Sequence, residues 1–254
     1  MTDFRSRVLA GDMLIGSFSD LASPLAVELL GRAGMDWVVL DLEHGAATEA
    51  DLLGLLYAAA TSAMAPIVRP PSAERLRVGR ALDLGAAGIM LPQLQSIEEV
   101  RAAVAYLRYP PVGARGVALR TRGAGMGTLG HADVARVVNE RIVGIVQIES
   151  LGAVAAADEI AALDEVDVLF VGPADLSHAL GAPGRFADQP YLDALGTVAA
   201  AAKRHGKAAG ILIYDPAVFA QHAELGFTVI GIGSEGSYVS AGATAMLRAA
   251  GRQG

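Results

Sequence analysis

The clearest indication of the architecture lies in VGIVQIES at residues 143–150 and VLFVGPAD at residues 168–175. Each stretch begins with a short apolar run rich in β-branched residues and ends in polar residues. The segment between them, 151–167, is helix-like in composition. An alternation of strand, helix and strand is typical of βα units in a parallel sheet.

Eight such apolar runs occur along the chain, and each is apolar enough to be buried on both faces, as barrel strands are. The predicted strands are 13–18, 37–42, 66–69, 88–91, 143–148, 168–171, 208–213 and 228–232. Four glycines fall just before a predicted strand, where a helix must end and the backbone often needs a positive φ. They are Gly34, Gly85, Gly206 and Gly226. We therefore predict an α/β protein, a single (β/α)8 TIM barrel that occupies residues 1–254.

Helix start signals support the same plan, because Ser and Thr are preferred at helix N-caps. Ser23 precedes 25–30, Thr48 precedes 49–60, and Ser96 precedes 97–107. The alternative is an open doubly wound sheet, which carries a glycine-rich turn after its first strand. The sequence SFSD at 17–20 has no such turn, which favours the barrel.

The composition excludes several classes of function. Cysteine is absent, so disulfides and thiolate nucleophiles are absent too. The net charge is −7 and no block of Lys or Arg marks a nucleic-acid surface. No apolar run reaches the roughly 20 residues of a membrane-spanning helix, and the polar segment 1–12 does not resemble a secretion signal. We expect a cytoplasmic protein with neither nucleic acid nor membrane as a partner.

The longest irregular stretch is 109–130, which is rich in Pro, Gly and Arg. Long loops in compact proteins are usually functional or mobile. We expect this loop to emerge at the C-terminal face of the barrel, where active sites are built. The alternative is a flexible insertion without a role in the site.

Polar residues occur at the C-terminal ends of four predicted strands, the positions where barrel enzymes carry their catalytic residues. These are Asp41-Leu42-Glu43-His44-Gly45, Arg69-Pro70-Pro71, Gln147-Ile148-Glu149-Ser150 and Gly172-Pro173-Ala174-Asp175. Because the carboxyl ends of parallel strands share one end of the barrel, these residues are expected to converge on one cleft.

Glu149 and Asp175 end neighbouring strands, and hard divalent cations such as Mg²⁺ or Mn²⁺ commonly take one or two protein carboxylates plus water and substrate oxygens. The competing interpretation is that each acid caps the following helix. Their occurrence together, beside Gln147 and a Gly-Pro turn, favours a metal site.

His44 and Arg69 are the candidate proton carrier and anion-binding group. A carboxylate such as Asp41 or Glu43 can fix a histidine tautomer, although a histidine in a loop is often a solvated surface residue. The guanidinium of Arg69 can hold a carboxylate or an enolate oxygen at two points, or form a structural ion pair. Asp83, near the end of a predicted helix, is expected to have a specific partner there.

These pieces, in this order, resemble the HpcH/HpaI aldolases, which are metal-dependent class II pyruvate aldolases with a phosphoenolpyruvate/pyruvate-domain-like barrel. The resemblance extends over nearly the whole chain. It is carried by residues 37–45, 67–70, 91–92, 109–116 (YPPVGARG), 146–149, 170–177 (FVGPADLS) and 206–213.

The resemblance implies that Glu149 and Asp175 bind a divalent cation, Mg, Mn or Co with Zn as a further option, and that no organic cofactor is needed. Arg69 would contact the 2-oxo acid and its enolate. His44 would relay protons through metal-bound water, supported by Asp41 and Asp83.

The substrate-binding residues implied by the resemblance are Arg69, Gln147, Gly172, Pro173, Ala174, Asp175 and, on the aldehyde side, Leu212. The family also implies a homo-oligomer, a hexamer built as a trimer of dimers, in which the last helix packs on a neighbouring subunit. Residues 240–247 are suitably helical. Leu42, and the run 117–129, depart from members closest to the 4-hydroxy-2-oxoheptanedioate enzymes, which leaves the aldehyde and oxo-acid preference open.

The expected reaction is aldol cleavage or condensation of a 4-hydroxy-2-oxo acid, with pyruvate or hydroxypyruvate and an aldehyde as the small molecules bound. A Schiff-base aldolase needs a lysine in the cleft, and only Lys203 and Lys207 occur, on a predicted helix and before a strand. Two alternatives stay open, an acyl-CoA ester lyase of the citrate lyase β type and a non-catalytic barrel that binds an oxo acid.

Overall fold

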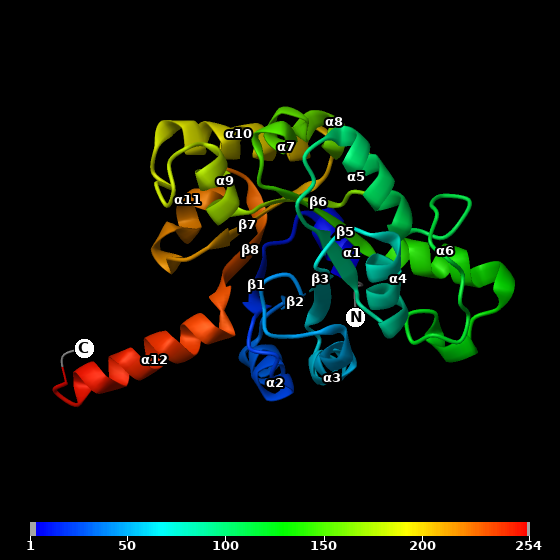
Figure 1. Cartoon of the computed structure of the whole chain (residues 1–254), viewed down its shortest axis with the longest axis horizontal. Coiled ribbons are helices and arrows are strands. Elements are labelled where there is room, and N and C mark those ends of the chain that lie inside the picture. Colours follow the sequence, from blue (N-terminus) through cyan, green and yellow to red (C-terminus); the bar gives the residue numbers. More distant parts are fainter. Residues whose placement is uncertain (1–3, 253–254) are drawn as a thin grey trace.

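The computed structural model describes residues 4–252 and contains eight parallel strands that close into a barrel in the order β1 to β8 (Figure 1). The strands are β1 (Leu14–Ser19), β2 (Trp37–Asp41), β3 (Ala65–Arg69), β4 (Gly88–Leu91), β5 (Val143–Ile148), β6 (Val168–Val171), β7 (Ala208–Ile213) and β8 (Phe227–Ser234). The predicted barrel is confirmed, and four of its strands, β4 to β7, have the predicted bounds. The predicted limits, residues 1 and 254, and the first three residues of segment 1–12 lie outside the described residues.

Helices pack around this barrel, except for the last one, which projects from it (Figure 1). They are α1 (Phe4–Ala10), α2 (Pro24–Ala33), α3 (Glu49–Ala59), α4 (Arg75–Leu84), α5 (Ile97–Val104), α6 (His131–Arg141), α7 (Leu151–Ala155), α8 (Ala157–Ala161), α9 (Pro173–Ala179), α10 (Gln189–Arg204), α11 (Phe219–Glu224) and α12 (Glu235–Ala249). The predicted cap residues Ser23 and Ser96 accept hydrogen bonds from the first turns of α2 and α5, and Gly34 and Gly85 end helices at φ of 96° and 102°. Within residues 4–252 no helix has the length and apolar character needed to cross a membrane.

The strand side chains alternate between two cores. Val38 and Leu40 on β2 point outward and pack under the helices, while Trp37 and Val39 belong to the separate cluster that fills the barrel. Trp37 fits because Gly16 on β1 faces it, and a Cβ at Gly16 would lie 2.1 Å from the indole ring. The interior is therefore a packed core, as in other barrels of this kind, and a substrate cleft is confined to the mouth.

The loop 109–130 lies at the opposite end of the barrel from the one predicted. Arg115 binds Asp83 at the end of α4, with 2.8 Å between Nη2 and Oδ1, and Arg122 donates to the carbonyl oxygen of Leu84. Those contacts are at the N-terminal ends of the strands. The expectation of a C-terminal-face loop was wrong because α5 and the 3-10 turn Ala105–Leu107 have already carried the chain back to that end.

Helix α12 extends away from the barrel (Figure 1). Glu235, its first residue, is the only buried residue of the helix. Val239 and Met246 are 64% and 75% exposed, so the helix presents apolar side chains that this chain does not cover.

Candidate active site at the mouth of the barrel

The two-residue alternation that fills the barrel continues into the polar residues at its mouth. On β3, Ala65 and Ile67 point inward, and Arg69 is next in that series. The same step leads from Val39 to Asp41 on β2. Successive side chains of a strand point to opposite faces, so residues two apart share the interior side. The mouth is thus a polar layer set on an apolar core.

These residues surround one cavity of about 310 Å³, the size of a pocket for a small metabolite. Nine residues predicted for the site line it, namely Asp41, His44, Arg69, Gln147, Gly172, Pro173, Ala174, Asp175 and Leu212. The remaining lining residues come mainly from the ends of β1, β7 and β8 and include Phe18, Asp20, Tyr214, Ser234 and Ser237. The predicted convergence of strand ends on one cleft is therefore observed.

Arg69 is buried and held by two carboxylates. Its Nε and Nη2 donate to Asp41 Oδ1 and Oδ2 at 2.9 and 2.6 Å, a two-point contact, and Nη1 lies 3.2 Å from Glu43 Oε2. The guanidinium carbon also lies 5.2 Å from the centre of the Phe18 ring. These carboxylates raise the pKa of Arg69 against the opposing effect of burial. The side chain is fixed before any ligand arrives.

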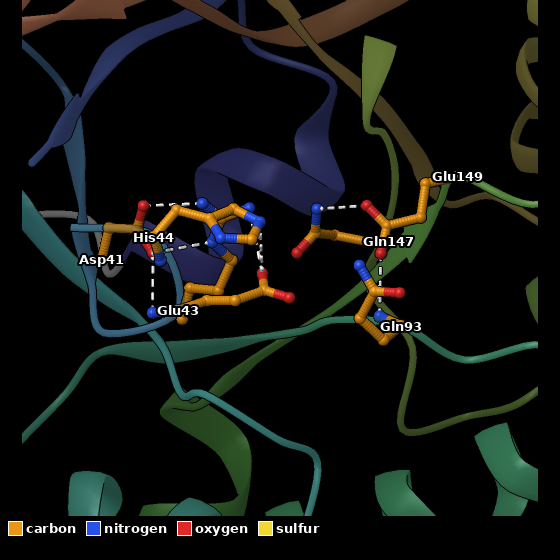
Figure 2. Close-up of polar contacts among 7 residues, drawn as sticks. Asp41, Glu43, His44, Gln93, Gln147 and Glu149 are labelled. Carbon is orange, nitrogen blue, oxygen red and sulfur yellow. Dashed lines mark hydrogen bonds and ion pairs between the residues drawn. The ribbon is translucent and has the colours of Figure 1, made fainter. Parts of the chain in front are cut away.

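Asp41 serves Arg69 and the backbone rather than the ring of His44. Its Oδ1 accepts hydrogen bonds from the amides of Glu43 and His44, which fixes the turn after β2. The carboxylate beside the imidazole is that of Glu43, with Oε2 3.8 Å from Nε2 of His44. Figure 2 shows Asp41, Glu43 and His44 together on one side of the site.

Glu149 is buried on the other side of the site in Figure 2, with Gln93 and Gln147. Its Oε1 accepts from the Gln93 amide, and its Oε2 accepts from Gln147 Nε2, both at 2.8 Å. Glu149 itself lies just behind the cavity wall that Gln147 and Gly172 form. Asp175, by contrast, lines the cavity and is exposed to it.

The electrostatics of the site favour a bound cation. Burial, together with the charges of Asp175 and Glu43, raises the pKa of Glu149 to about 7, although the Gln93 amide and Arg69 oppose the shift. Gln147 Oε1 is buried and lacks a hydrogen-bond donor among the described residues. Carboxylate and amide oxygens are ligands that Mg²⁺ and Mn²⁺ prefer. The donors present therefore fit a divalent cation.

No group of three or more His, Asp or Glu side chains within residues 4–252 is arranged as a complete metal site. A cation held by Glu149 and Asp175 would need water or substrate oxygens for its other positions, as is common for Mg²⁺.

Asp83 is the predicted site residue that the structure does not bring to this cavity. It lies at the C-terminal end of α4, on the other end of the barrel, where its carboxylate pairs with Arg115. The specific partner expected for Asp83 is thus Arg115. The guanidinium of Arg115 also stacks on Tyr109, with 4.4 Å to the ring centre.

Gln93 is a contact of the site that the sequence argument did not name, and Glu43 was named only as one of two possible carboxylate partners of His44. Glu43 lies between Asp41 and His44 in the sequence, so its place in that acidic turn was a usable signal. Gln93 has φ of 59°, a backbone conformation that L residues seldom adopt and that often accompanies functional sites. No spacing rule indicates such a residue in advance.

The fold and the site together define a (β/α)8-barrel enzyme whose mouth combines acidic oxygens, one buried arginine and one accessible histidine around a small-molecule cavity. Comparison with known proteins is in agreement. The family model for HpcH/HpaI aldolase/citrate lyase matches residues 14–241, so the chain belongs to that family.

Three similar proteins narrow the class of enzyme within this family. A 5-keto-4-deoxy-D-glucarate aldolase of Salmonella paratyphi C (strain RKS4594) is 40% identical over 232 residues, which cover 91% of this chain and 90% of that protein. The crystal structure of a HpcH/HpaI aldolase/citrate lyase family protein from Burkholderia cenocepacia J2315 is similar with a TM-score of 0.91 at 34% identity, covering 97% and 98% of the two chains. Citrate synthase SbnG has a TM-score of 0.88 at 28% identity, covering 98% of each chain. The protein is a carbon–carbon lyase of the aldolase type.

Proposed function

We propose that the protein cleaves and forms the C3–C4 bond of 4-hydroxy-2-oxo acids, releasing pyruvate or hydroxypyruvate and an aldehyde. The observation that carries this proposal is the arrangement around one small cavity. Arg69 and Asp175 line it, and Glu149, from the neighbouring strand end, lies just behind its wall and close enough for the charge of Asp175 to raise its pKa. This set provides two acidic oxygens for a cation and one fixed cation for the substrate.

Glu149 and Asp175 are the residues that would hold the divalent cation, with Mg²⁺, Mn²⁺ or Co²⁺ as candidates. When bound, the cation supplies Lewis acidity toward the oxygens of the 2-oxo acid. In the present arrangement each oxygen of Glu149 accepts one hydrogen bond, Oε1 from the Gln93 amide and Oε2 from Gln147 Nε2. Cation binding is therefore expected to exchange the Gln147 contact for a metal contact.

Arg69 places a permanent positive charge where negative charge develops on the 2-oxo oxygen. Its two-point contact with Asp41 means that little reorganisation is needed when the reaction occurs, which is how such fixed donors accelerate a reaction. His44 is accessible and lines the cavity, so it can accept the proton of the 4-hydroxyl group and return a proton to the three-carbon product. The first turn of α9, at Ala174 and Asp175, offers backbone amides for the substrate carboxylate.

The aldehyde half of the substrate is proposed to lie toward the ends of β1, β7 and β8, where Leu212 is found. This wall also carries polar groups from Asp20, Tyr214 and Ser234. Hydroxyl and carboxylate groups of that kind suit a hydroxylated aldehyde. A keto-deoxy sugar acid, as named for the Salmonella relative, is the first substrate to test.

The competing enzyme classes lack support at this cavity. Arg69 is the only Lys or Arg side chain among the described residues that line it, which leaves no partner for the phosphates of coenzyme A. Lys203 and Lys207 are remote from it. Lys203 lies on α10, and Lys207 donates to Leu163 at the N-terminal end of the barrel.

Asp83 can support His44 only from a second copy of the chain, because the two residues lie at opposite ends of one barrel. We therefore propose a homo-oligomer in which Asp83 of one subunit reaches His44 of the next. The uncovered apolar side chains of α12 are proposed to pack on another subunit in the same assembly.

The test is an assay of metal-free protein with added Mg, Mn, Co or Zn salts. The panel of 4-hydroxy-2-oxo acids includes 5-keto-4-deoxy-D-glucarate, and the products measured are pyruvate and hydroxypyruvate. We expect cleavage only when a divalent cation is added. Cleavage in the presence of excess chelator, or reductive trapping of substrate on the protein by borohydride, would refute the metal-dependent mechanism. Binding of the acids without turnover under any condition would favour the non-catalytic barrel.

A further inference from the structure

Glu43 lies between the two side chains on which the proposed reaction depends. Its Oε2 is 3.2 Å from Arg69 Nη1 and 3.8 Å from His44 Nε2. The Glu43 side chain is only 9% exposed, while that of His44 is 60% exposed. A buried carboxylate thus lies next to the exposed ring of His44 (Figure 2) and next to the buried guanidinium of Arg69.

Oε2 of Glu43 is buried and has no hydrogen-bond donor among the described residues. The ion pair with Arg69 is close but does not have hydrogen-bond geometry. A buried acceptor without a donor lowers the stability of the fold, so buried oxygens of this kind usually have a hydrogen-bond donor. Two movable side chains lie next to this carboxylate: the Gln93 amide, which lowers the pKa of Glu43 as a hydrogen-bond donor, and the His44 ring, whose Nε2 is 3.8 Å from Oε2. A shift of about 1 Å would bring Nε2 to hydrogen-bond distance.

The other acids assigned to His44 are engaged elsewhere in this chain. Asp41 holds Arg69 through both oxygens and the following turn through Oδ1. Asp83 pairs with Arg115 at the other end of the barrel. Within residues 4–252, Glu43 is the only carboxylate found within 4.0 Å of the His44 ring.

We propose that Glu43 is a positioning residue that orients the His44 imidazole through Nε2 and fixes the Nη1 side of Arg69. Because Glu43 lies on the Nε2 side, the substrate and Asp83 of a neighbouring subunit would both approach His44 from its Nδ1 side. The proton carrier and the enolate-binding arginine are coupled through one carboxylate. This inference rests on the proposed function and deepens it at the same site.

The stability of the protein offers a readout that separates positioning from a structural role. Burial raises the pKa of Glu43 above its ordinary value, and the charge of Asp41 acts in the same direction. The charges of Arg69 and His44 and a hydrogen bond from the Gln93 side chain oppose this shift. The charge is therefore held at some cost to folding. Glu43→Gln keeps the shape and removes that cost, so its unfolding temperature is expected to equal or exceed that of the wild type.

The experiment compares Glu43→Gln and Glu43→Asp with wild type and with Glu235→Gln. Glu235 is a matched control, because it is another buried glutamate at this end of the barrel and its carboxylate accepts hydrogen bonds from Ser19 and Leu21. Steady-state cleavage and exchange of the pyruvate methyl protons in D₂O are measured with added Mn²⁺. The His44 tautomer is followed in ¹H–¹⁵N spectra of the metal-free proteins.

We expect Glu43→Gln to lower kcat and the exchange rate by about 10- to 100-fold, the range typical of residues that orient catalytic groups, with KM changed less than threefold. The Nε2–H tautomer of His44 should lose population in Glu43→Gln. Glu43→Asp, which keeps the charge, should recover part of the rate, and Glu235→Gln should stay within twofold of wild type.

Near-normal kcat in Glu43→Gln would overturn the inference. So would a loss of rate together with a lower unfolding temperature and an unchanged tautomer. An inactive wild type would instead refute the proposed function.

Discussion

Individual side chains at the mouth of the barrel are held before any ligand is present. Arg69 shows this most clearly, because Asp41 accepts hydrogen bonds from its Nε and Nη2, and Glu43 lies next to its Nη1. A lysine would keep the charge, but it is a point charge on a flexible stem and cannot form the two-point contact.

Arg69→Lys is therefore expected to reduce kcat by about 10²- to 10³-fold, the loss typical of removing one fixed donor from a developing oxyanion. Steady-state release of pyruvate measures this. Arg77→Lys is a suitable control, since Arg77 is exposed on α4 and pairs with Glu49. Turnover of Arg69→Lys within a few-fold of wild type would contradict the role given to this arginine.

Glu149 makes the metal-free protein sensitive to pH. Its folded-state pKa of about 7 lies above the ordinary value of 4.5 because of burial. A group with a raised pKa favours folding below its unfolded pKa, and that contribution is lost as pH rises through the folded value. The free energy of unfolding should therefore fall by about 3 kcal/mol between pH 4.5 and 7 because of Glu149.

Urea unfolding of the metal-free protein across this pH range measures the effect. Glu149→Gln should remove most of this pH dependence. Mn²⁺ should restore stability above pH 7, and its apparent affinity should weaken below pH 7, where a proton competes for the carboxylate. Equal pH dependence in wild type and Glu149→Gln would show that another group is responsible.

At the scale of single elements, the backbone of the turn from β6 into α9 lies in close contact with Glu149, the candidate metal ligand. A Cβ at Gly172 would lie 2.6 Å from Glu149 Oε2 and 3.0 Å from its Cβ. Glycine is required here by close approach, since its φ of −87° is open to other residues.

Gly172→Ala should displace Glu149 and weaken Mn²⁺ binding by about 10- to 100-fold, as disturbance of a ligand's surroundings typically does. Calorimetric titration with Mn²⁺ measures this directly. Gly196→Ala in α10 is the matched control, because nothing lies within 4 Å of its added Cβ, and it should bind metal normally. Unchanged affinity in Gly172→Ala would mean that Glu149 is not a ligand.

At the scale of the whole molecule, the site is proposed to be shared between copies. The barrel places Asp83 and His44 at opposite ends, and α12 extends from the body with exposed apolar side chains (Figure 1). Within one chain Asp83 pairs with Arg115 and cannot reach His44, and the apolar side chains of α12 stay exposed.

Mixing two impaired variants tests this sharing. His44→Ala and Asp83→Asn should each have low activity alone, and co-refolding them should restore part of it by creating sites with both residues intact. Light scattering checks that both variants assemble. Met246→Glu, which places a charge on the exposed face of α12, is expected to weaken assembly. No gain of activity in well-assembled mixtures would exclude Asp83 from the neighbouring site.

Much of the barrel could be predicted because its signals are local. The inward residues of β5 follow every second position, from Val143 through Ile145 to Gln147. Glycines such as Gly34 and Gly85 mark the helix ends by a backbone requirement that sequence shows directly. The convergence of nine predicted residues on one cavity follows from the parallel arrangement, in which all strands end on the same side.

Placement that depends on several segments at once could not be predicted. The loop 109–130 comes after β4 in the sequence, but α5 and the turn Ala105–Leu107 lie between β4 and the loop. The loop therefore emerges at the N-terminal end of the barrel. The resemblance implied that Asp83 supports His44, and its position near a helix end indicated only that it has a specific partner. The partner within this chain, Arg115, is 32 residues away in the sequence. Likewise, the choice of Asp41 for Arg69 and of Glu43 for His44 depends on side-chain distances. Local periodicity thus fixes which residues point inward, whereas long-range packing and desolvation select the partner of each charge.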